Sequence, residues 1–401
     1  MRCTPIVGLA LVLLVPAALL LADVARLDAP PPSGAAGTHE PTPRFGDEIA
    51  VRLVTVVVRV VDGAGNPLQG LTPKDFRVRV GRREVPVAAV DWFASGPDRQ
   101  AAASGDAGSP ALPGKAASTL AAPFLPPALA IPDGEGAAAA PAASPAPEAT
   151  GKLVVIFVQA DNNAPSRVRG HLRTLPFTRE LLAALQPDDR VAVVSFDSHL
   201  KLWQDFTRDR EAVPAVIYHA IHFGGQPPMP PAPSISGSPT VPSLARSFDA
   251  GEALRAASPE RALAVTAQAL AALPGEKVLV FLAWGLGSFS SMGTHMTPAF
   301  APAVRALTAA RATVFVLDVT EADSHDLEVG LRGIADATGG TYDKTNLFPA
   351  LAVRQLARTI SGHYVLTLDS ALLPKAGGEV DVELRGRRGT VLQRPLSLPP
   401  A

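Results

Sequence analysis

The chain has 401 residues, enough for two domains or for one large domain with additions. Its 36 lysines and arginines nearly balance 37 aspartates and glutamates, and a net charge of −1 provides no basic field that would attract nucleic acid or anionic lipid. The single cysteine, Cys3, excludes disulfides, multi-cysteine zinc sites and thiol catalysis from the body of the chain.

The N-terminal residues carry an export signal. Arg2 precedes an apolar run without charges from Thr4 to Ala22, and we predict that residues 1–25 are a secretory signal peptide. An uncleaved anchor is the alternative, because the run approaches the roughly 20 residues that span a bilayer. It would be the chain's contact with the membrane. In both cases the rest of the protein is predicted to lie outside the cytoplasm, secreted, periplasmic or attached to the envelope.

Two segments have compositions that cannot form a packed core. Residues 26–48 are rich in proline, glycine and alanine and are predicted to be a flexible tether. Residues 94–150 consist almost wholly of alanine, proline, glycine and serine, without helical or strand periodicity. We therefore predict that 94–150 is a disordered insertion that spaces two modules.

Residues 49–93 alternate as β-strands do. Val54, Val56, Val58 and Val60 share one strand face, and 76–90 has the pattern of a hairpin with "GRR" near its tip. Such a module is too small to bury both faces of a sheet alone. Because residues 363–401 return to β alternation, we predict that the two segments form one small antiparallel sandwich, with an α/β domain inserted between its halves.

Between these halves, residues 151–362 alternate apolar strands with amphipathic helices. This pattern predicts a doubly wound, mostly parallel sheet with helices on both faces. One helix is expected over 166–186, although Pro176 puts its middle in doubt, and another begins after Ser258, a good N-cap. A proline-rich connection, 224–243, is longer than the usual loop. The predicted strands occupy 152–159, 189–197, 199–207, 277–284, 313–319 and 341–343.

Three stretches, in the same order along the chain, resemble a bacterial family of exported von Willebrand factor A-related proteins. They are "VVVRVVDGAGNPLQGLTPKDFRVRVGRREVPV", "LQPDDRVAVVSFDSHLKLWQDFTRDREAV" and "LRGIADATGGTYDKTNLFPALAVRQLARTISGHYVLTL". The resemblance covers roughly 50–93 and 152–385. It implies a von Willebrand factor A fold, with a doubly wound sheet of about six strands, one of them an antiparallel edge strand.

The resemblance also implies a site at the carboxyl end of the sheet, where the family holds a divalent cation with an Asp-x-Ser-x-Ser run, a threonine and a second aspartate. Here the first aspartate corresponds to Asp161 and the first serine to Asn163, whereas Pro165 replaces the second serine. Thr240 is the candidate threonine, and Trp284 stands where the second aspartate would be. We predict that this degenerate site, reduced to Asp161 and Asn163, holds no Mg²⁺, and that the protein has no cofactor. Weak Mg²⁺ binding is the alternative.

These considerations predict a non-enzymatic module that binds a protein partner of unknown identity. The binding rim would comprise 161–168, 224–243 and 284–298, with contacts by shape and apolar surface around Trp284. Asp161 would then cap a loop rather than bind magnesium. The rim residues that we single out are Asp161, Asn162, Asn163, Thr240, Trp284 and Ser288.

Two other functions remain open on the sequence. The serines between Ser288 and Ser291 could make the protein an extracytoplasmic hydrolase, although the run lacks the G-x-S-x-G pattern and no partner histidine or acid can be named from it. The loop is therefore expected to be flexible and without catalytic function. A purely structural component of the envelope is the other alternative.

Three further polar residues are weighed and given ordinary roles. His219 and His222 have the i, i+3 spacing of a metal pair on a helix, but no third ligand is evident, and we expect helix-surface histidines. Asp318 ends a predicted strand and could face the same rim as Asp161. A capping or salt-bridge role is expected for it.

Overall fold

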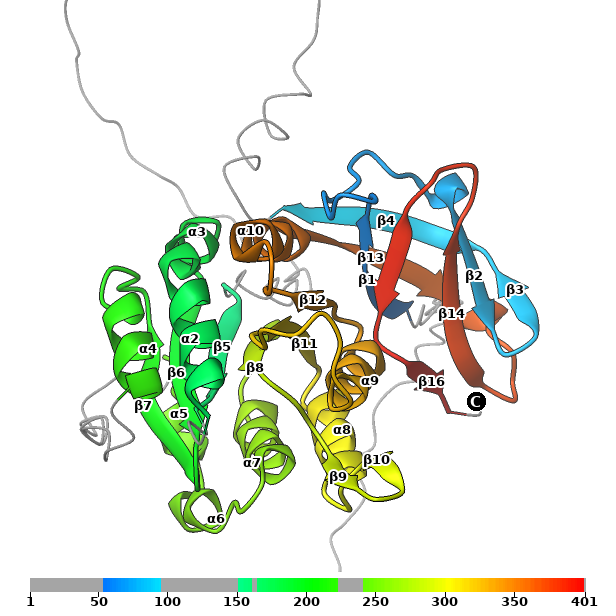
Figure 1. The fold of residues 1–401 in the computed structure, drawn as a ribbon. Helices are drawn as coiled ribbons and strands as arrows, with labels where there is room; N and C mark the ends of the chain where they lie inside the picture. The colour runs from blue at the N-terminus through cyan, green and yellow to red at the C-terminus, as the bar shows by residue number, and fades with distance from the viewer. Residues whose placement is uncertain (1–52, 95–150, 161–163, 223–240, 400–401) are drawn as a thin grey trace, which may run out of the picture. The chain divides into compact units, whose positions relative to one another are not determined.

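The computed structural model describes residues 53–94, 151–160, 164–222 and 241–399, which belong to one compact unit, Val51–Ala401. The predicted signal segment, the tether and residues 95–150 of the insertion lie outside the described residues. The described part contains a six-stranded sheet, two four-stranded sheets and a two-stranded hairpin (Figure 1). No helix in this part has both the length and the apolar character that crossing a bilayer requires.

The six-stranded sheet has the order β12-β11-β8-β5-β6-β7. Neighbouring strands are parallel except β6 and β7, so the antiparallel strand β7 lies at an edge. The predicted sheet of about six strands with one antiparallel edge strand is thereby confirmed. The strands are β5 (Leu153–Gln159), β6 (Arg190–Phe196), β7 (Leu200–Thr207), β8 (Lys277–Ala283), β11 (Ala312–Asp318) and β12 (Tyr342–Lys344).

Both faces of this sheet are buried, which is why its strands are continuously apolar. Leu153, Val155 and Phe157 of β5 pack with α7 (Pro259–Ala271), α8 (Phe300–Ala309) and α9 (Glu328–Thr338). The alternate residues, Val154 and Ile156, pack with helices on the opposite face, α3 (Thr178–Ala183), α4 (Val213–His222) and α10 (Pro349–Thr359). The sheet therefore lies between two helical layers (Figure 1).

The helix expected over 166–186 is interrupted at Pro176, the residue that put its middle in doubt. It consists of α2 (Pro165–Thr174), a 3₁₀ turn (η2, Leu175–Phe177) and α3. Pro176 lies in the 3₁₀ turn, because proline has no N–H to continue α-helical hydrogen bonding. The predicted cap of α7 is confirmed, with Ser258 Oγ accepting from the Arg261 amide at 3.2 Å. Two short helices before it, α5 (Leu244–Ser247) and α6 (Ala250–Leu254), were not predicted.

The N- and C-terminal segments combine into two antiparallel sheets, as predicted, with orders β15-β1-β13-β4 and β16-β14-β2-β3. Val56, Val58 and Val60 form their common core with Val78 and Tyr364. Three-residue 3₁₀ turns, η1 (Pro73–Asp75) and η3 (Ser370–Leu372), precede β2 and follow β13. The strands are β1 (Leu53–Val61), β2 (Phe76–Val80), β3 (Arg83–Val85), β4 (Val87–Ala94), β13 (Gly362–Asp369), β14 (Gly378–Leu384), β15 (Thr390–Gln393) and β16 (Leu396–Leu398).

Charged side chains connect β1 to the start of β8. Arg59, on the face of β1 opposite the valines, is buried and forms an ion pair with Glu276, the residue before β8. The His363 imidazole lies 3.4 Å from the same carboxylate. Burial raises the pKa of Glu276, but the charges of Arg59, His363 and Lys152 outweigh it, and the pKa lies below its usual 4.5. The carboxylate is therefore charged at neutral pH.

Candidate functional site

The order of the central sheet creates a switch point between β5 and β8. The chain leaves β5 for α2, on the face of α4 and α10. It leaves β8 for a hairpin of β9 (Ser288–Ser290) and β10 (Gly293–His295), and then for α8 on the opposite face. In doubly wound folds the diverging connections at such a point form the ligand-binding crevice. We call the ends of β5, β8, β11 and β12, with the residues that follow them, the carboxyl edge.

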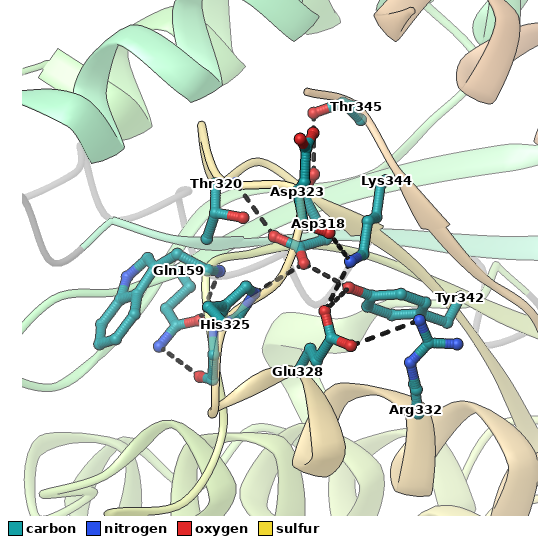
Figure 2. Close-up of polar contacts among 12 residues, drawn as sticks. Gln159, Asp318, Thr320, Asp323, His325, Glu328, Arg332, Tyr342, Lys344 and Thr345 are labelled. Atoms are coloured by element: carbon teal, nitrogen blue, oxygen red, sulfur yellow. Dashed lines mark hydrogen bonds and ion pairs between the residues drawn. The ribbon is translucent and has the colours of Figure 1, made fainter. Parts of the chain in front are cut away.

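Gln159, the last residue of β5, bridges this switch point. It is 1% exposed, and its Oε1 accepts hydrogen bonds from the amides of Trp284 (3.1 Å) and Gly285 (3.3 Å). Its Nε2 donates to the Gly285 carbonyl at 3.0 Å, and its own carbonyl lies 2.9 Å from His171 Nε2 in α2. One uncharged side chain thus fixes the connection after β8 to the end of β5 (Figure 2).

The aromatic residue at the switch point carries a cation on its face. The guanidinium carbon of Arg167, in the first turns of α2, lies 3.3 Å from the centre of the Trp284 ring. Trp284 is half-buried, and its Nε1 is buried without a hydrogen-bond partner among the described atoms. A guanidinium over an indole is a favourable cation–π contact. The pair joins α2 to the residue after β8.

Asp318 ends β11, at the same edge, and its side chain is wholly buried. Its Oδ2 accepts hydrogen bonds from His325 Nε2 (2.8 Å) and from the Tyr342 hydroxyl, and its Oδ1 accepts one from the Thr320 amide at 3.0 Å. Burial alone would raise the pKa of this carboxyl group, but the hydrogen bonds from His325, Tyr342 and Thr320 outweigh it. The pKa is lowered from 3.8, and Asp318 is a buried carboxylate. Of the expected capping or salt-bridge role, the structure shows the cap, in which Asp318 Oδ1 accepts from the Thr320 amide.

Tyr342 and Glu328 extend the cluster. Glu328, the first residue of α9, lies 2.7 Å from Lys344 Nζ through its Oε2, and the Tyr342 hydroxyl lies 3.4 Å from the same oxygen. The hydrogen bond from Lys344 lowers the pKa of Glu328. Burial and the neighbouring Asp318 raise the pKa of Tyr342, so its hydroxyl stays protonated and donates. Figure 2 shows Asp318, His325, Glu328, Tyr342 and Lys344 converging from β11, α9, β12 and the connection between them.

The backbone at the end of β11 is fixed as well. The Asp318 carbonyl accepts from the Thr345 amide (2.9 Å) and hydroxyl (2.8 Å), which attaches the residue after β12. On the helical side, a Cβ added to Gly170 of α2 would lie 1.8 Å from the Val319 carbonyl oxygen. Only glycine permits α2 to approach the β11 end so closely. The cluster is therefore built on tightly packed elements.

The metal site that the family resemblance implies is tested only in part by the described residues. Asp161, Asn162, Asn163 and Thr240 lie outside them. Among the described residues at the switch point, Gln159 offers an oxygen already engaged by two amides, and Trp284, which the resemblance aligns with the second aspartate, has no oxygen in its side chain. These donors do not suit Mg²⁺, which requires about six oxygen ligands.

The serine-rich segment differs from the expected flexible loop. It forms the β9–β10 hairpin, and Ser288 pairs directly across it with His295. Ser288 Oγ lies 2.9 Å from His295 Nε2, so the partner histidine that could not be named from the sequence is seven residues away. His295 is exposed and Ser288 is half-buried. His219 and His222 lie on α4 beside Tyr218 and belong to no three-ligand group among the described residues.

Sequence reasoning placed Asp318 at this edge but missed its partners. His325, Glu328, Tyr342 and Lys344 were not singled out, and neither was Gln159. A faint signal existed, because a strand ending in aspartate is followed by "DSHDLE", with histidine and glutamate three residues apart at the start of a helix. The contribution of Tyr342 and Lys344 depends on β12 lying beside β11, which spacing alone does not show.

Comparisons with known proteins give a likeness of fold. No family model and no curated protein matches the chain. Among solved structures, the PilB minor pilin from Streptococcus sanguinis is 12% identical, with a TM-score of 0.35 over 54% of this chain and 63% of the pilin. A von Willebrand factor type A protein from Catenulispora acidiphila is 14% identical, with a TM-score of 0.35 over 62% of this chain and 66% of that protein.

BatB from Bacteroides thetaiotaomicron is 12% identical, with a TM-score of 0.33 over 53% of this chain and 97% of BatB. The chain spans less than two thirds of the pilin and of the Catenulispora protein. These solved structures, one of them a von Willebrand factor type A protein, are similar to the chain in fold alone, at low sequence identity. A similarity of this level carries no argument about partner, metal or activity.

Proposed function

We propose that this protein is an exported, non-enzymatic protein-interaction module that binds a protein partner through the carboxyl edge of its α/β domain, without a bridging Mg²⁺. The observation that carries the proposal is the bridge made by Gln159. Its amide holds Trp284 and Gly285 at the point where a doubly wound fold binds its ligand. The Trp284 surface is thereby fixed before any partner arrives.

The same edge exposes apolar side chains suited to a protein surface. Leu347 and Phe348, which follow β12, are 69% and 66% exposed, and Leu351 in α10 is 50% exposed. Aromatic residues and arginine contribute most to protein–protein binding energy, usually where they are packed against a partner. Trp284 with Arg167, and Phe348 with its neighbours, supply both kinds of side chain.

The test is capture of partners from the envelope fraction with the exported chain as bait. We expect a partner that is retained by the wild type and by Leu372→Ala, and lost with Trp284→Ala or Phe348→Ala. Leu372 is a matched control, because it is 41% exposed but lies after β13, in the sandwich. Adding Mg²⁺ should leave retention unchanged. Equal retention by all variants, or retention that requires Mg²⁺, would refute the proposal, and failure to retain any protein would favour a structural envelope component.

A hydrolase is the second candidate because Ser288 and His295 are within hydrogen-bonding distance. A serine nucleophile also needs its histidine oriented by a third group. Among the described residues no ion pair joins His295 to a carboxylate. Labelling by an active-serine probe that is lost in both Ser288→Ala and His295→Ala would establish this function, whereas absence of labelling would eliminate it.

A further inference from the structure

A group of mixed nitrogen and oxygen donors lies at the carboxyl edge, away from the switch point. Asp318, His325 and Glu328 each offer one ligand atom, and these atoms all lie within 4.8 Å of one another. Among the residues that the structure describes, this is the one group of three such side chains. Its members come from the end of β11, the connection that follows and the first turn of α9 (Figure 2).

The spacing of these atoms suits a transition-metal ion. Bonds of about 2.0–2.2 Å from a four-coordinate zinc to nitrogen or oxygen place the ligand atoms about 3.4 Å apart. His325 Nε2 and Asp318 Oδ2 are 2.8 Å apart. The three ligand atoms all lie within 4.8 Å of one another, so side-chain rotations that shift them by roughly 1 Å would close the group around one ion.

The charges of the cluster give a second, independent indication. Asp318 has no exposed side-chain surface, and the one ion pair that the described residues provide for it is to a histidine. A buried carboxylate without a full countercharge is costly. Glu328, by contrast, has Lys344 at 2.7 Å and Arg332 at 3.5 Å. A dication between the two carboxylates would compensate the negative charge of Asp318, for which neither Lys344 nor Arg332 forms an ion pair.

We propose that Asp318, His325 and Glu328 bind a first-row transition-metal dication of the Zn²⁺ class, and that Lys344 supplies the countercharge of Glu328 when the metal is absent. An imidazole nitrogen with two carboxylates favours such an ion over Mg²⁺ or Ca²⁺, which prefer oxygen alone. His325 then coordinates through Nε2 and carries its proton on Nδ1. The Tyr342 hydroxyl donates a hydrogen bond to Asp318 and so orients that ligand.

Lys344 has room to withdraw. Its side chain is 27% exposed, and its ammonium also donates to the Asp323 carbonyl, so it can turn toward solvent when a dication takes its place at Glu328. The two cations therefore compete for one carboxylate. This competition predicts that removing the lysine strengthens metal binding, which an incidental histidine on the surface would not do.

The test is titration of the metal-free exported chain with Zn²⁺ by calorimetry, repeated with Co²⁺, whose absorption spectrum reports the ligands. We expect one Zn²⁺ per chain, a loss of affinity of at least ~100-fold in His325→Ala, and a gain of ~10-fold or more in Lys344→Met. His295→Ala, an exposed histidine paired only across the hairpin with Ser288, is the control and should bind as the wild type does. Urea unfolding of each variant verifies that it is folded.

No stoichiometric binding, equal binding by His325→Ala, or weaker binding by Lys344→Met would each overturn the metal site. The cluster would then be a structural one, with His325 as the countercharge of Asp318. This proposal uses none of the residues on which partner binding depends. Capture of a partner by His325→Ala, tested beside Trp284→Ala, keeps the failure of one proposal distinct from the failure of the other.

Discussion

Lowering the pH should destabilise this protein through His171. The side chain lies in α2, is 1% exposed and has its Nε2 2.9 Å from the Gln159 carbonyl, while its Nδ1 is buried without a hydrogen-bond partner. Burial lowers the pKa of His171 from 6.5 to about 4, although the bond to Gln159 acts in the opposite direction. The folded protein therefore keeps this imidazole neutral under conditions in which the unfolded chain protonates it.

The size of the effect follows from the two pKa values. Above pH 6.5 His171 is neutral in both the folded and the unfolded protein, and its full contribution to stability is present. This contribution is lost as the pH falls from 6.5 toward 4, because the unfolded state binds more protons. At about pH 5 the unfolded imidazole is almost wholly protonated and the native one almost wholly neutral. With 1.36 kcal/mol for each pKa unit, the loss relative to about pH 7.5 is about 2 kcal/mol.

The assay compares urea unfolding of the wild type with that of His171→Gln at several pH values from about 7.5 to 5. The glutamine amide can still donate to the Gln159 carbonyl but does not titrate, so its free energy of unfolding should fall by about 2 kcal/mol less over this range. His295→Gln controls for the removal of an exposed histidine and should follow the wild type. Parallel pH profiles of wild type and His171→Gln, or an NMR titration of His171 in the folded protein near 6.5, would refute the argument.

Three other substitutions test which contacts stabilise the carboxyl edge and the ion pair between β1 and the start of β8. Gly170→Ala should lower the free energy of unfolding by about 3 kcal/mol, because its Cβ would meet the backbone of Val319, the residue after β11. Gly333→Ala in α9, with its nearest contact at 3.4 Å, should be tolerated, and thermal unfolding compares the two variants. Gln159→Leu should lower the free energy of unfolding, measured in urea, by about 3 kcal/mol, since it leaves the amides of Trp284 and Gly285 without acceptors. Arg59→Met should lower the free energy of unfolding by about 3 kcal/mol, because it leaves Glu276 charged and largely buried. Adding Glu276→Gln should restore part of this loss, which a double-mutant cycle would show.

The fold was predictable because its strongest signals are local. The strand beginning at Leu153 is apolar at every position, as a strand buried on both faces must be, and Pro176 and Ser258 mark a helix break and a helix start by their own chemistry. The pairing of the N- and C-terminal segments could be predicted because the N-terminal segment alone is too small to bury both faces of a sheet. A small β module needs a partner, and the end of the chain offers one with the same alternation.

The candidate site was harder to predict from the sequence, because its residues are brought together only by the order of the strands in the sheet. Lys344 reaches Glu328 because β12 lies beside β11, and a three-residue strand is too short to show alternation in a sequence. The same holds for Ser288 and His295, whose facing positions depend on a hairpin with three residues in each strand. Gln159 resembles an ordinary polar residue at a strand end, and nothing local indicates that its amide crosses to the neighbouring strand.

The bridge at Gln159 bears on how the edge can bind a partner. In a metal-bridged edge a cation connects the loops and supplies the charge that attracts a ligand carboxylate. Here an uncharged amide makes the connection between β5 and the residues after β8, and Arg167 supplies positive charge over Trp284. Both are covalent parts of the chain, so the connection between β5 and the residues after β8 is made on folding rather than on binding. If the proposed function holds, partner affinity should depend on the packing of Trp284, and Gln159→Leu should weaken partner capture even though the contacting side chains are unchanged.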